Sequence, residues 1–162
     1  PVIVAGGIGS AAFPFFVESL IRTGRRPDLL YGGRTHRDLP MRDWFEERAE
    51  TVVTTDDGSA GEHALVTVPL RRMLEAGVAG GCPRLYTCGP DPMMRAVAAL
   101  AAEFRVPAEA ALETPMACGY GVCVGCVVEV VTPDGANADD SYGRYKRVCV
   151  DGPVFPTSEV RW

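Results

Sequence analysis

The sequence predicts an α/β fold in which a doubly wound, parallel-sheet domain is followed by a small cysteine-rich domain. Strand and helix signals alternate through the first two-thirds of the 162 residues. Repeated strand–helix units form a parallel sheet with helices on both faces. After Pro107 no long helical period follows, and short valine-rich runs with glycines and cysteines take over. We therefore expect domains at residues 1–107 and 108–162.

The elements of the first domain follow one another without long gaps. The expected strands cover residues 1–9, 27–34, 51–58 and 83–90, and the expected helices 10–24, 38–50, 68–78 and 91–106. Asp91 is placed to cap the last helix, Pro92 suits its first position, and Pro107 ends it. In the second domain we expect a strand at 126–131, an acidic surface insertion at 132–143, and short strands and turns at 145–162.

Composition indicates a compact protein with a real core. Apolar residues make up 47% of the chain, and the formal net charge of −5 gives no sign of a nucleic-acid partner. No apolar run reaches the roughly 18 residues that span a bilayer. Six cysteines fit a reducing, cytoplasmic location, where thiolates stay free to bind metal. The chain starts at Pro1, inside the first expected strand, which is typical of a fragment or a processed C-terminal portion.

Four cysteines form the most specific pattern in the chain. Cys118, Cys123 and Cys126 have C-x4-C-x2-C spacing, and Cys149 follows in a later segment. This is the ligand pattern of a plant-type 2Fe–2S cluster. Glycines at 119, 121 and 125 lie between the cysteines, and they allow the positive φ values and close backbone approach that a cluster loop requires. The pattern predicts a site that carries single electrons.

Three other interpretations of these cysteines remain open. A structural zinc site usually needs two C-x2-C pairs, and only Cys123 and Cys126 have that spacing. Disulfides are the second alternative, although the apolar segments can fold without them. The third is a set of ordinary buried thiols, which would not need glycines at this density. Cys82, in a GGCP turn, is expected to be an incidental cysteine.

Loops that follow parallel strands gather at the carboxyl edge of the sheet, where nucleotides bind. Gly7 and Gly9, before a helix, suit a pyrophosphate, although an ordinary tight turn has the same sequence. Arg34 ends the second strand where an acidic residue is typical of ribose recognition, so NAD and NADP both stay possible, and a solvated charge is the alternative. Thr54 to Gly58 suit ribose hydroxyls or a simple turn.

The turn Cys88-Gly89-Pro90 is more specific than the other loops. It changes direction sharply between a strand and a helix and has a small thiol at its tip. A nicotinamide ring could lie there with Cys88 near its reactive carbon, because Gly89 permits close approach. Cys88 is therefore a candidate catalytic residue.

The strand-end segments GGIG, GGR, TTDDG and CGP, in this order, resemble the NAD-binding module of the ferredoxin–NADP reductase superfamily. The segments ALETPMACGYGVCVGC and YKRVCVDGPVF are similar to the electron-transfer subunits of bacterial dihydroorotate dehydrogenase type B. The resemblance implies that Cys118, Cys123, Cys126 and Cys149 hold a 2Fe–2S cluster. It also implies three groups of NAD contacts: Gly6, Gly7 and Gly9 at the phosphates, Asp56, Asp57 and Gly58 near the ribose, and Cys88, Gly89 and Pro90 around the nicotinamide.

The same resemblance implies an electron relay in pyrimidine biosynthesis. A catalytic, FMN-containing subunit would oxidise dihydroorotate, and electrons would pass through the cluster and FAD to NAD+, within a heterotetramer. The flavin-binding barrel of the family is absent from these 162 residues, so FAD binding is expected to need a segment or chain beyond them. Two alternatives remain: a related reductase subunit of the sulfite reductase or hydrogenase type, and a zinc-stabilised nucleotide-binding module without a redox role.

Overall fold

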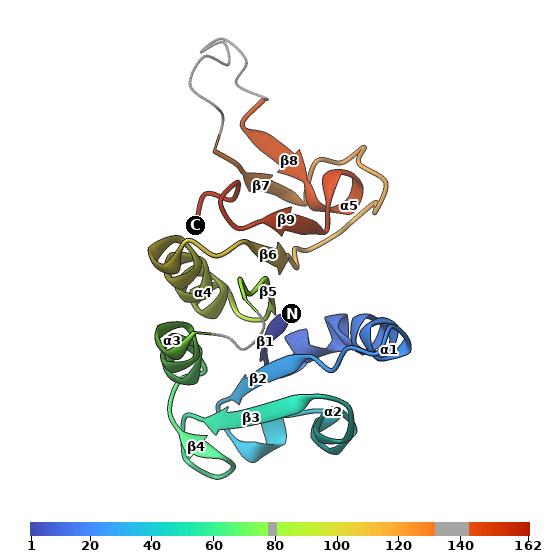
Figure 1. The fold of residues 1–162 in the computed structure, drawn as a ribbon. Helices are drawn as coiled ribbons and strands as arrows, with labels where there is room; N and C mark the ends of the chain where they lie inside the picture. Colours follow the sequence, from blue (N-terminus) through green and yellow to red (C-terminus); the bar gives the residue numbers. More distant parts are fainter. Residues whose placement is uncertain (78–80, 132–142) are drawn as a thin grey trace.

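The computed structural model describes residues 1–77, 81–131 and 143–162. Its centre is a seven-stranded sheet with the order β4-β3-β2-β1-β5-β6-β9 (Figure 1). All neighbouring strands are parallel except β6 and β9. The strands of this sheet are β1 (Val2–Gly6), β2 (Asp28–Gly33), β3 (Glu50–Thr55), β4 (Glu62–His63), β5 (Leu85–Cys88), β6 (Ala108–Ala111) and β9 (Val154–Pro156). This topology confirms the mostly parallel α/β fold.

Helices cover both faces of the sheet, as a doubly wound fold requires (Figure 1). They are η1 (Gly7–Ala12), α1 (Pro14–Arg22), η2 (His36–Asp38), α2 (Arg42–Arg48), α3 (Thr67–Ala76) and α4 (Asp91–Phe104). One buried cluster joins the sheet to α1 and α2, and a second joins it to α3 and α4. The residues Val2 to Ala5 of β1 are fully buried between these layers, which explains their continuous apolar run.

Two expected helices differ from those observed. The helix expected at 10–24 is a 3-10 helix, η1, followed by α1, which begins at Pro14 because proline suits a first helical turn. The helix expected at 38–50 is shorter: α2 starts at Arg42, after Met41 in the left-handed conformation.

α4 begins at Asp91, as the range 91–106 predicts, but the prediction that Asp91 caps it is wrong. Pro90 is its N-cap, Asp91 is the first helical residue, and no side chain caps the helix. The helix ends at Phe104 because Arg105 takes the left-handed conformation, with a φ of 55°.

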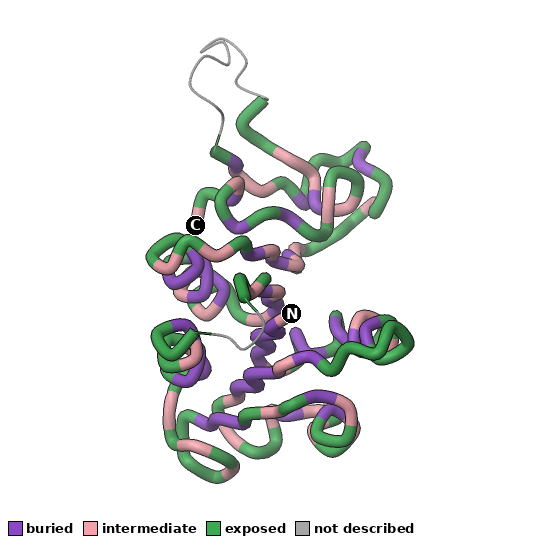
Figure 2. The backbone as a smooth tube through the Cα atoms, viewed as in Figure 1, coloured by how far each residue is buried: buried purple, intermediate pink, exposed green. Residues whose placement is uncertain are grey.

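The cysteine-rich part contributes to two sheets. β7 (Val127–Glu129) and β8 (Tyr145–Arg147) form an antiparallel pair, and α5 (Val148–Asp151) follows β8. β9 returns to the main sheet and pairs with β6. A third buried cluster joins these strands to α4 through Met94 and Phe155, and Figure 2 shows buried segments continuing from the main sheet into this region. The boundary expected at residues 107/108 stays a prediction.

The acidic insertion expected at 132–143 lies, apart from Gly143, outside the described residues. Within the described ranges, no helix has the length and apolar character needed to cross a membrane.

Candidate functional site

The four predicted ligand cysteines lie in the C-terminal region. Cys118 and Cys123 belong to the loop that follows β6, Cys126 precedes β7, and Cys149 lies in α5. The Sγ atoms of Cys126 and Cys149 are 3.3 Å apart, and the backbone N–H of Val148 donates to the Cys126 carbonyl. Folding therefore brings the distant fourth cysteine against the loop, as the spacing pattern requires.

Backbone N–H groups point at the sulfur atoms of the loop. The Cys123 N–H lies 3.4 Å from Cys118 Sγ, and the Gly125 N–H lies 3.4 Å from Cys123 Sγ. The N–H groups of Cys123 and Tyr120 lower the pKa of the Cys118 thiol to about 6. A thiolate is the form that binds a metal, so the loop is arranged for ligation.

The pKa values of Cys126 and Cys149 are shifted in opposite directions by their contact with each other. The backbone N–H of Cys149 lowers the pKa of Cys126, whereas the Cys126 side chain raises the pKa of Cys149. Two thiolates at this separation repel each other, and positive charge bound between them would remove the conflict. This donor set fits an iron–sulfur cluster. Among the described residues, however, no three His, Cys, Asp or Glu side chains converge as a ready metal site.

The backbone of the loop partly follows the glycine pattern. Gly119 and Gly121 have φ values of 73° and 87°. Gly125 is not among the positive-φ residues of the described chain, and the adjacent Val124 takes that conformation, with a φ of 47°. A side chain on Gly121 would press on Val150 and on Arg147, whose guanidinium donates to the Gly121 carbonyl at 3.3 Å. Glycine at 121 is thus needed for both conformation and space.

A second site, which we call the strand-end cleft, lies at the carboxyl ends of the parallel strands. It is a cavity of about 1090 Å³. Its lining comes from the loops after β1, β2, β3, β4 and β5, together with the start of α4 and Glu113: Gly6, Gly7, Ile8, Gly9, Gly32, Gly33, Arg34, Arg37, Asp38, Pro40, Asp56, Leu65, Val66, Thr67, Gly89, Pro90, Asp91, Pro92, Met93, Ala96 and Glu113. This is the edge at which a doubly wound sheet binds nucleotides.

Most of the predicted nucleotide contacts line this cleft, but four do not. The cleft is lined by Gly6, Gly7, Gly9, Arg34, Asp56, Gly89 and Pro90, whereas Thr54, Asp57, Gly58 and Cys88 are not part of its wall. Asp57 instead accepts a hydrogen bond from the Ser59 N–H at 2.9 Å, within a turn in which Gly58 has a positive φ. Thr54 is buried, and a side chain on Gly32 would meet its hydroxyl.

Cys88 lies directly behind the cleft wall. It is almost fully buried, and burial, followed by the charge of Glu113, raises the pKa of its thiol to about 11. Its Sγ is 3.9 Å from the Glu113 carboxylate, which does line the cleft. At neutral pH this thiol is protonated and can donate to Glu113.

The glycine loop after β1 packs directly on the turn after β5. A Cβ on Gly9 would lie 2.6 Å from the backbone of Cys88, and a Cβ on Gly89 would lie 3.0 Å from the backbone of Gly6. These glycines therefore serve close contact between two loops of the protein, in addition to any contact with a ligand.

Several cleft residues were not anticipated from the sequence. Arg37, Asp38 and Pro40 come from the loop after β2, in which Thr35 and Asp38 form a reciprocal capping box. Leu65 to Thr67 and Met93 complete the apolar part of the wall. The rule that strand-end loops gather at one edge could have found the first group, had it been extended several residues beyond each strand.

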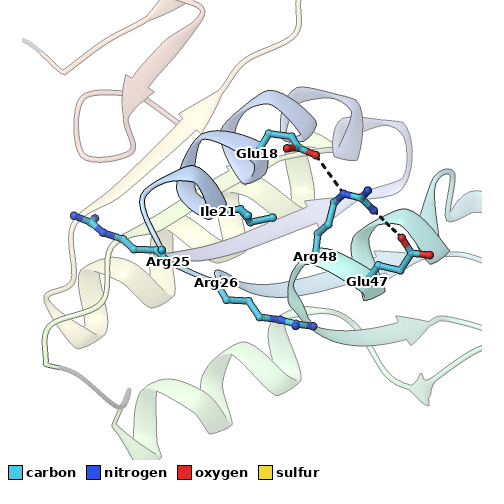
Figure 3. A pocket seen from close by; sticks show the side chains of 7 residues that line it. Glu18, Ile21, Arg25, Arg26, Glu47 and Arg48 are labelled. Carbon is cyan, nitrogen blue, oxygen red and sulfur yellow. Dashed lines mark hydrogen bonds and ion pairs between the residues drawn. The ribbon is translucent and has the colours of Figure 1, made fainter.

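A smaller cavity of about 590 Å³ lies between α1 and α2, near the amino end of β2. Its charged residues largely satisfy one another. Arg48 pairs with Glu18 and Glu47, as the dashed lines in Figure 3 mark, and Arg26 pairs with Glu50 at 2.8 Å. Arg25 points away from this group (Figure 3). The arrangement is that of a surface ion-pair network.

Comparison with known proteins identifies a family for the cysteine-rich region and relatives for nearly the whole chain. Residues 113–161 match the family described as the iron–sulfur cluster binding domain of dihydroorotate dehydrogenase B. Over 160 residues the chain is 36% identical to an electron transfer subunit homologue of dihydroorotate dehydrogenase B (NAD(+)) from Aquifex aeolicus, covering 98% of this chain and 57% of that protein. It is 34% identical to the electron transfer subunit from Desulforamulus reducens, with 99% and 58% coverage.

A solved structure has the same fold along nearly the whole chain. It is described as an NADH-dependent reduced ferredoxin-NADP oxidoreductase that performs flavin-based electron bifurcation. It matches with a TM-score of 0.79 and 32% identity, over 99% of this chain and 53% of that one. The chain thus spans a little over half the length of the relatives it matches.

Proposed function

Because this chain is a homologue of the electron transfer subunits of dihydroorotate dehydrogenase B, we propose that it carries electrons between a 2Fe–2S cluster and NAD+ in such a complex. The complex would oxidise dihydroorotate in pyrimidine biosynthesis. A catalytic, FMN-containing subunit would be its partner, in a cytoplasmic heterotetramer.

One observation carries this proposal: along the chain, Glu113 links the strand-end cleft to the iron–sulfur segment. It lines the strand-end cleft, lies 3.9 Å from Cys88 Sγ, and is the first residue of the segment that matches the iron–sulfur domain. The cysteine loop follows directly, with Cys118 only five residues further on. The chain thus continues from the cleft wall into the cysteine loop with no intervening domain, which supports electron transfer between the two sites through FAD.

We assign the cluster to Cys118, Cys123, Cys126 and Cys149. The thiolates would supply its four protein ligands, and the N–H groups of Cys123 and Gly125 already point at sulfur. When bound, the cluster would supply one-electron transfer, and FAD would connect this to the two-electron chemistry of nicotinamide. We propose that FAD is held by a segment or chain beyond these 162 residues.

We assign the strand-end cleft to NAD. Gly6, Gly7 and Gly9 would approach the phosphates, with Arg34 and Asp56 toward the adenosine ribose and Gly89 and Pro90 beside the nicotinamide. Cys88 lies behind the cleft wall, so its thiol would act on the nicotinamide through the Glu113 carboxylate, which lines the cleft. We assign Thr54, Asp57 and Gly58 to the support of the ribose loop, since they are not part of the cleft wall.

The partner would dock on the cysteine loop. Tyr120, Val122 and Val124 are exposed there, between and beside the ligand cysteines. Exposed apolar side chains gathered in one short loop mark an interaction surface, and electrons must enter close to the cluster.

The cluster assignment is tested by metal analysis and spectroscopy of the anaerobically reconstituted protein. We expect two irons and two sulfides per chain, visible charge-transfer bands, and an EPR signal that appears on reduction. Protein that takes up zinc but no iron or sulfide would overturn the assignment and favour the zinc-stabilised module.

The dinucleotide assignment is tested by the substitution Ile8→Glu. Ile8 lines the cleft with a side chain that is 71% exposed, so the protein should fold normally while a carboxylate is placed beside the pyrophosphate. We expect at least a tenfold weaker affinity for NADH, and NADPH is titrated in parallel because Arg34 leaves both possible. Gly9 is unsuitable for this test because a side chain there meets the backbone of Cys88.

The control is Phe15→Glu. Phe15 is 85% exposed on α1 and lies outside the cleft wall. This variant should bind NADH like the wild type. Equal NADH affinity in wild type and Ile8→Glu would refute the proposed phosphate contact.

The similarity to the NADH-dependent reduced ferredoxin-NADP oxidoreductase supports a second candidate, a reductase subunit that exchanges electrons with ferredoxin. The two candidates differ in their electron donor. Reduction of the cluster by dihydroorotate in the presence of the catalytic subunit favours the first, and reduction only by reduced ferredoxin favours the second.

A further inference from the structure

Tyr31 connects two segments that line the strand-end cleft. It lies on β2, is fully buried, and packs the edge of its ring against Phe45 with centroids 5.8 Å apart. Its hydroxyl lies 2.9 Å from Ser10 Oγ, in η1, and 2.7 Å from the Pro40 carbonyl, in the loop before α2. The same hydroxyl is 3.4 Å from the Gly7 carbonyl. One polar atom in an apolar core thus reaches both loops.

The polarity of these hydrogen bonds can be assigned. A phenol has one proton to donate, and a carbonyl can only accept. The Tyr31 O–H therefore donates to the Pro40 carbonyl, over the shortest distance, and the Ser10 O–H donates to Tyr31 Oη. Burial raises the pKa of Tyr31, so the phenol keeps its proton at neutral pH. The result is a relay that runs from Ser10 through Tyr31 to Pro40.

The relay joins the segments that carry the proposed phosphate and adenosine contacts. Gly7 and Gly9 precede Ser10 within η1, and Arg37 and Asp38 precede Pro40 by only a few residues. All four line the cleft. Resting on the dinucleotide site proposed above, we propose that Tyr31 is a positioning residue: its hydroxyl holds the glycine loop and the Pro40 loop at the separation that fits the ADP half of the dinucleotide.

Loss of the hydroxyl would leave two polar groups without partners. In Tyr31→Phe the ring still fills its place against Phe45, but the buried Ser10 Oγ and the partly buried Pro40 carbonyl lose their hydrogen bonds. A buried unpaired polar group is costly, so the Pro40 loop shifts toward solvent to regain a partner. Only molecules in which both loops keep their wild-type positions then bind the dinucleotide. The apparent affinity therefore falls in proportion to the fraction of such molecules.

The test compares three variants of the full chain by calorimetric titration. For Tyr31→Phe we expect the Kd values for NADH and for ADP-ribose to rise together by about tenfold. The Kd for nicotinamide mononucleotide, which would not reach the Pro40 loop in the proposed arrangement, should stay within about twofold of wild type. A loss of folding would weaken all three ligands alike, so this split separates positioning from a merely structural role.

Two further variants complete the test. Ser10→Ala breaks the same relay at its other end and should weaken ADP-ribose in the same direction, which keeps the test available if Tyr31→Phe folds poorly. Tyr86→Phe is the matched control: Tyr86 lies on β5, packs on Phe16 with centroids 4.6 Å apart, and lies outside the cleft wall. Removing the Tyr86 hydroxyl should leave the Kd values for NADH, ADP-ribose and nicotinamide mononucleotide unchanged.

The outcomes separate this proposal from the one on which it rests. If the wild type binds NADH or NADPH and both relay variants bind ADP-ribose equally well, the positioning role is overturned and the dinucleotide site stands. If the wild type binds neither dinucleotide, the site itself is overturned, and the role of Tyr31 with it.

Discussion

At the scale of single residues, Cys88 combines an unusual pKa with a defined position. Burial and the Glu113 carboxylate raise the pKa of its thiol to about 11. At pH 8 only about one molecule in a thousand then has a Cys88 thiolate, and the thiolate is the reactive form. A raised pKa means that reactivity is suppressed below pH 11 and increases tenfold with each pH unit up to that value.

We therefore expect Cys88 to be alkylated by iodoacetamide far more slowly than the exposed Cys82 at pH 7, with the Cys88 rate rising tenfold per unit up to pH 9.5. Peptide mapping by mass spectrometry separates the two sites. Glu113→Gln removes the nearby negative charge and should accelerate Cys88 labelling at a fixed pH. Equal rates for Cys88 and Cys82 at pH 7 would contradict the assignment.

The sequence predicted residues well where a spacing rule applied and less well where local backbone geometry decides. The four cysteines proposed as ligands are marked by their spacing, and two of them, Cys126 and Cys149, meet in the structure. In the loop after β3, however, adjacent aspartates cannot be distinguished by sequence. Asp56 lines the cleft, whereas Asp57 turns back to accept from Ser59. Likewise, the positive φ near the third ligand falls on Val124 and not on Gly125.

At the scale of elements, β9 attaches the cysteine-rich segment to the main sheet. Phe155, its central residue, is buried with Met94 of α4, Cys126 and Val148. It pairs with Ala110 of β6 across the antiparallel edge. The same side chain thus supports the end of the sheet and the base of the cysteine loop.

We expect Phe155→Ala to lower the free energy of unfolding by about 3–5 kcal/mol, because it removes a fully buried aromatic ring. Trp162 packs against the same cluster, so its fluorescence in a Trp44→Phe background reports urea unfolding of this region. The control Phe15→Ala removes an exposed ring and should change stability by less than about 0.5 kcal/mol. A loss below about 1 kcal/mol for Phe155→Ala would show that β9 does not anchor the segment.

The strands that the sequence did not predict share a physical cause. β4 and β6 are two and four residues long, too short for an alternating pattern to be recognised. β6 has the sequence AEAA, and alanine and glutamate favour helix. It is a strand because it pairs with β5 on one side and β9 on the other. Tertiary pairing, which no local window contains, overrides propensity here.

At the scale of the whole molecule, the two candidate sites depend on different sources of stability. The strand-end cleft is built on buried strands with helices on both faces. Within the part of the chain that the structure describes, the cysteine loop rests on the short β7–β8 pair, α5 and β9, and many of its apolar side chains are exposed. A segment of this kind gains much of its stability from the metal that it binds.

Removal of iron should therefore loosen one part of the molecule only. We expect hydrogen exchange, measured by mass spectrometry on the reconstituted and the chelator-treated protein, to lose protection in β7, β8 and α5. Protection in β1, β2 and β5 should persist, because their hydrogen bonds lie inside the two main core clusters. The cleft should also keep its function, so NADH should protect η1 equally in both preparations. Loss of protection throughout the sheet would mean that the two sites fold as one cooperative unit, and unchanged protection in β7 and β8 would mean that the loop is stable without its metal.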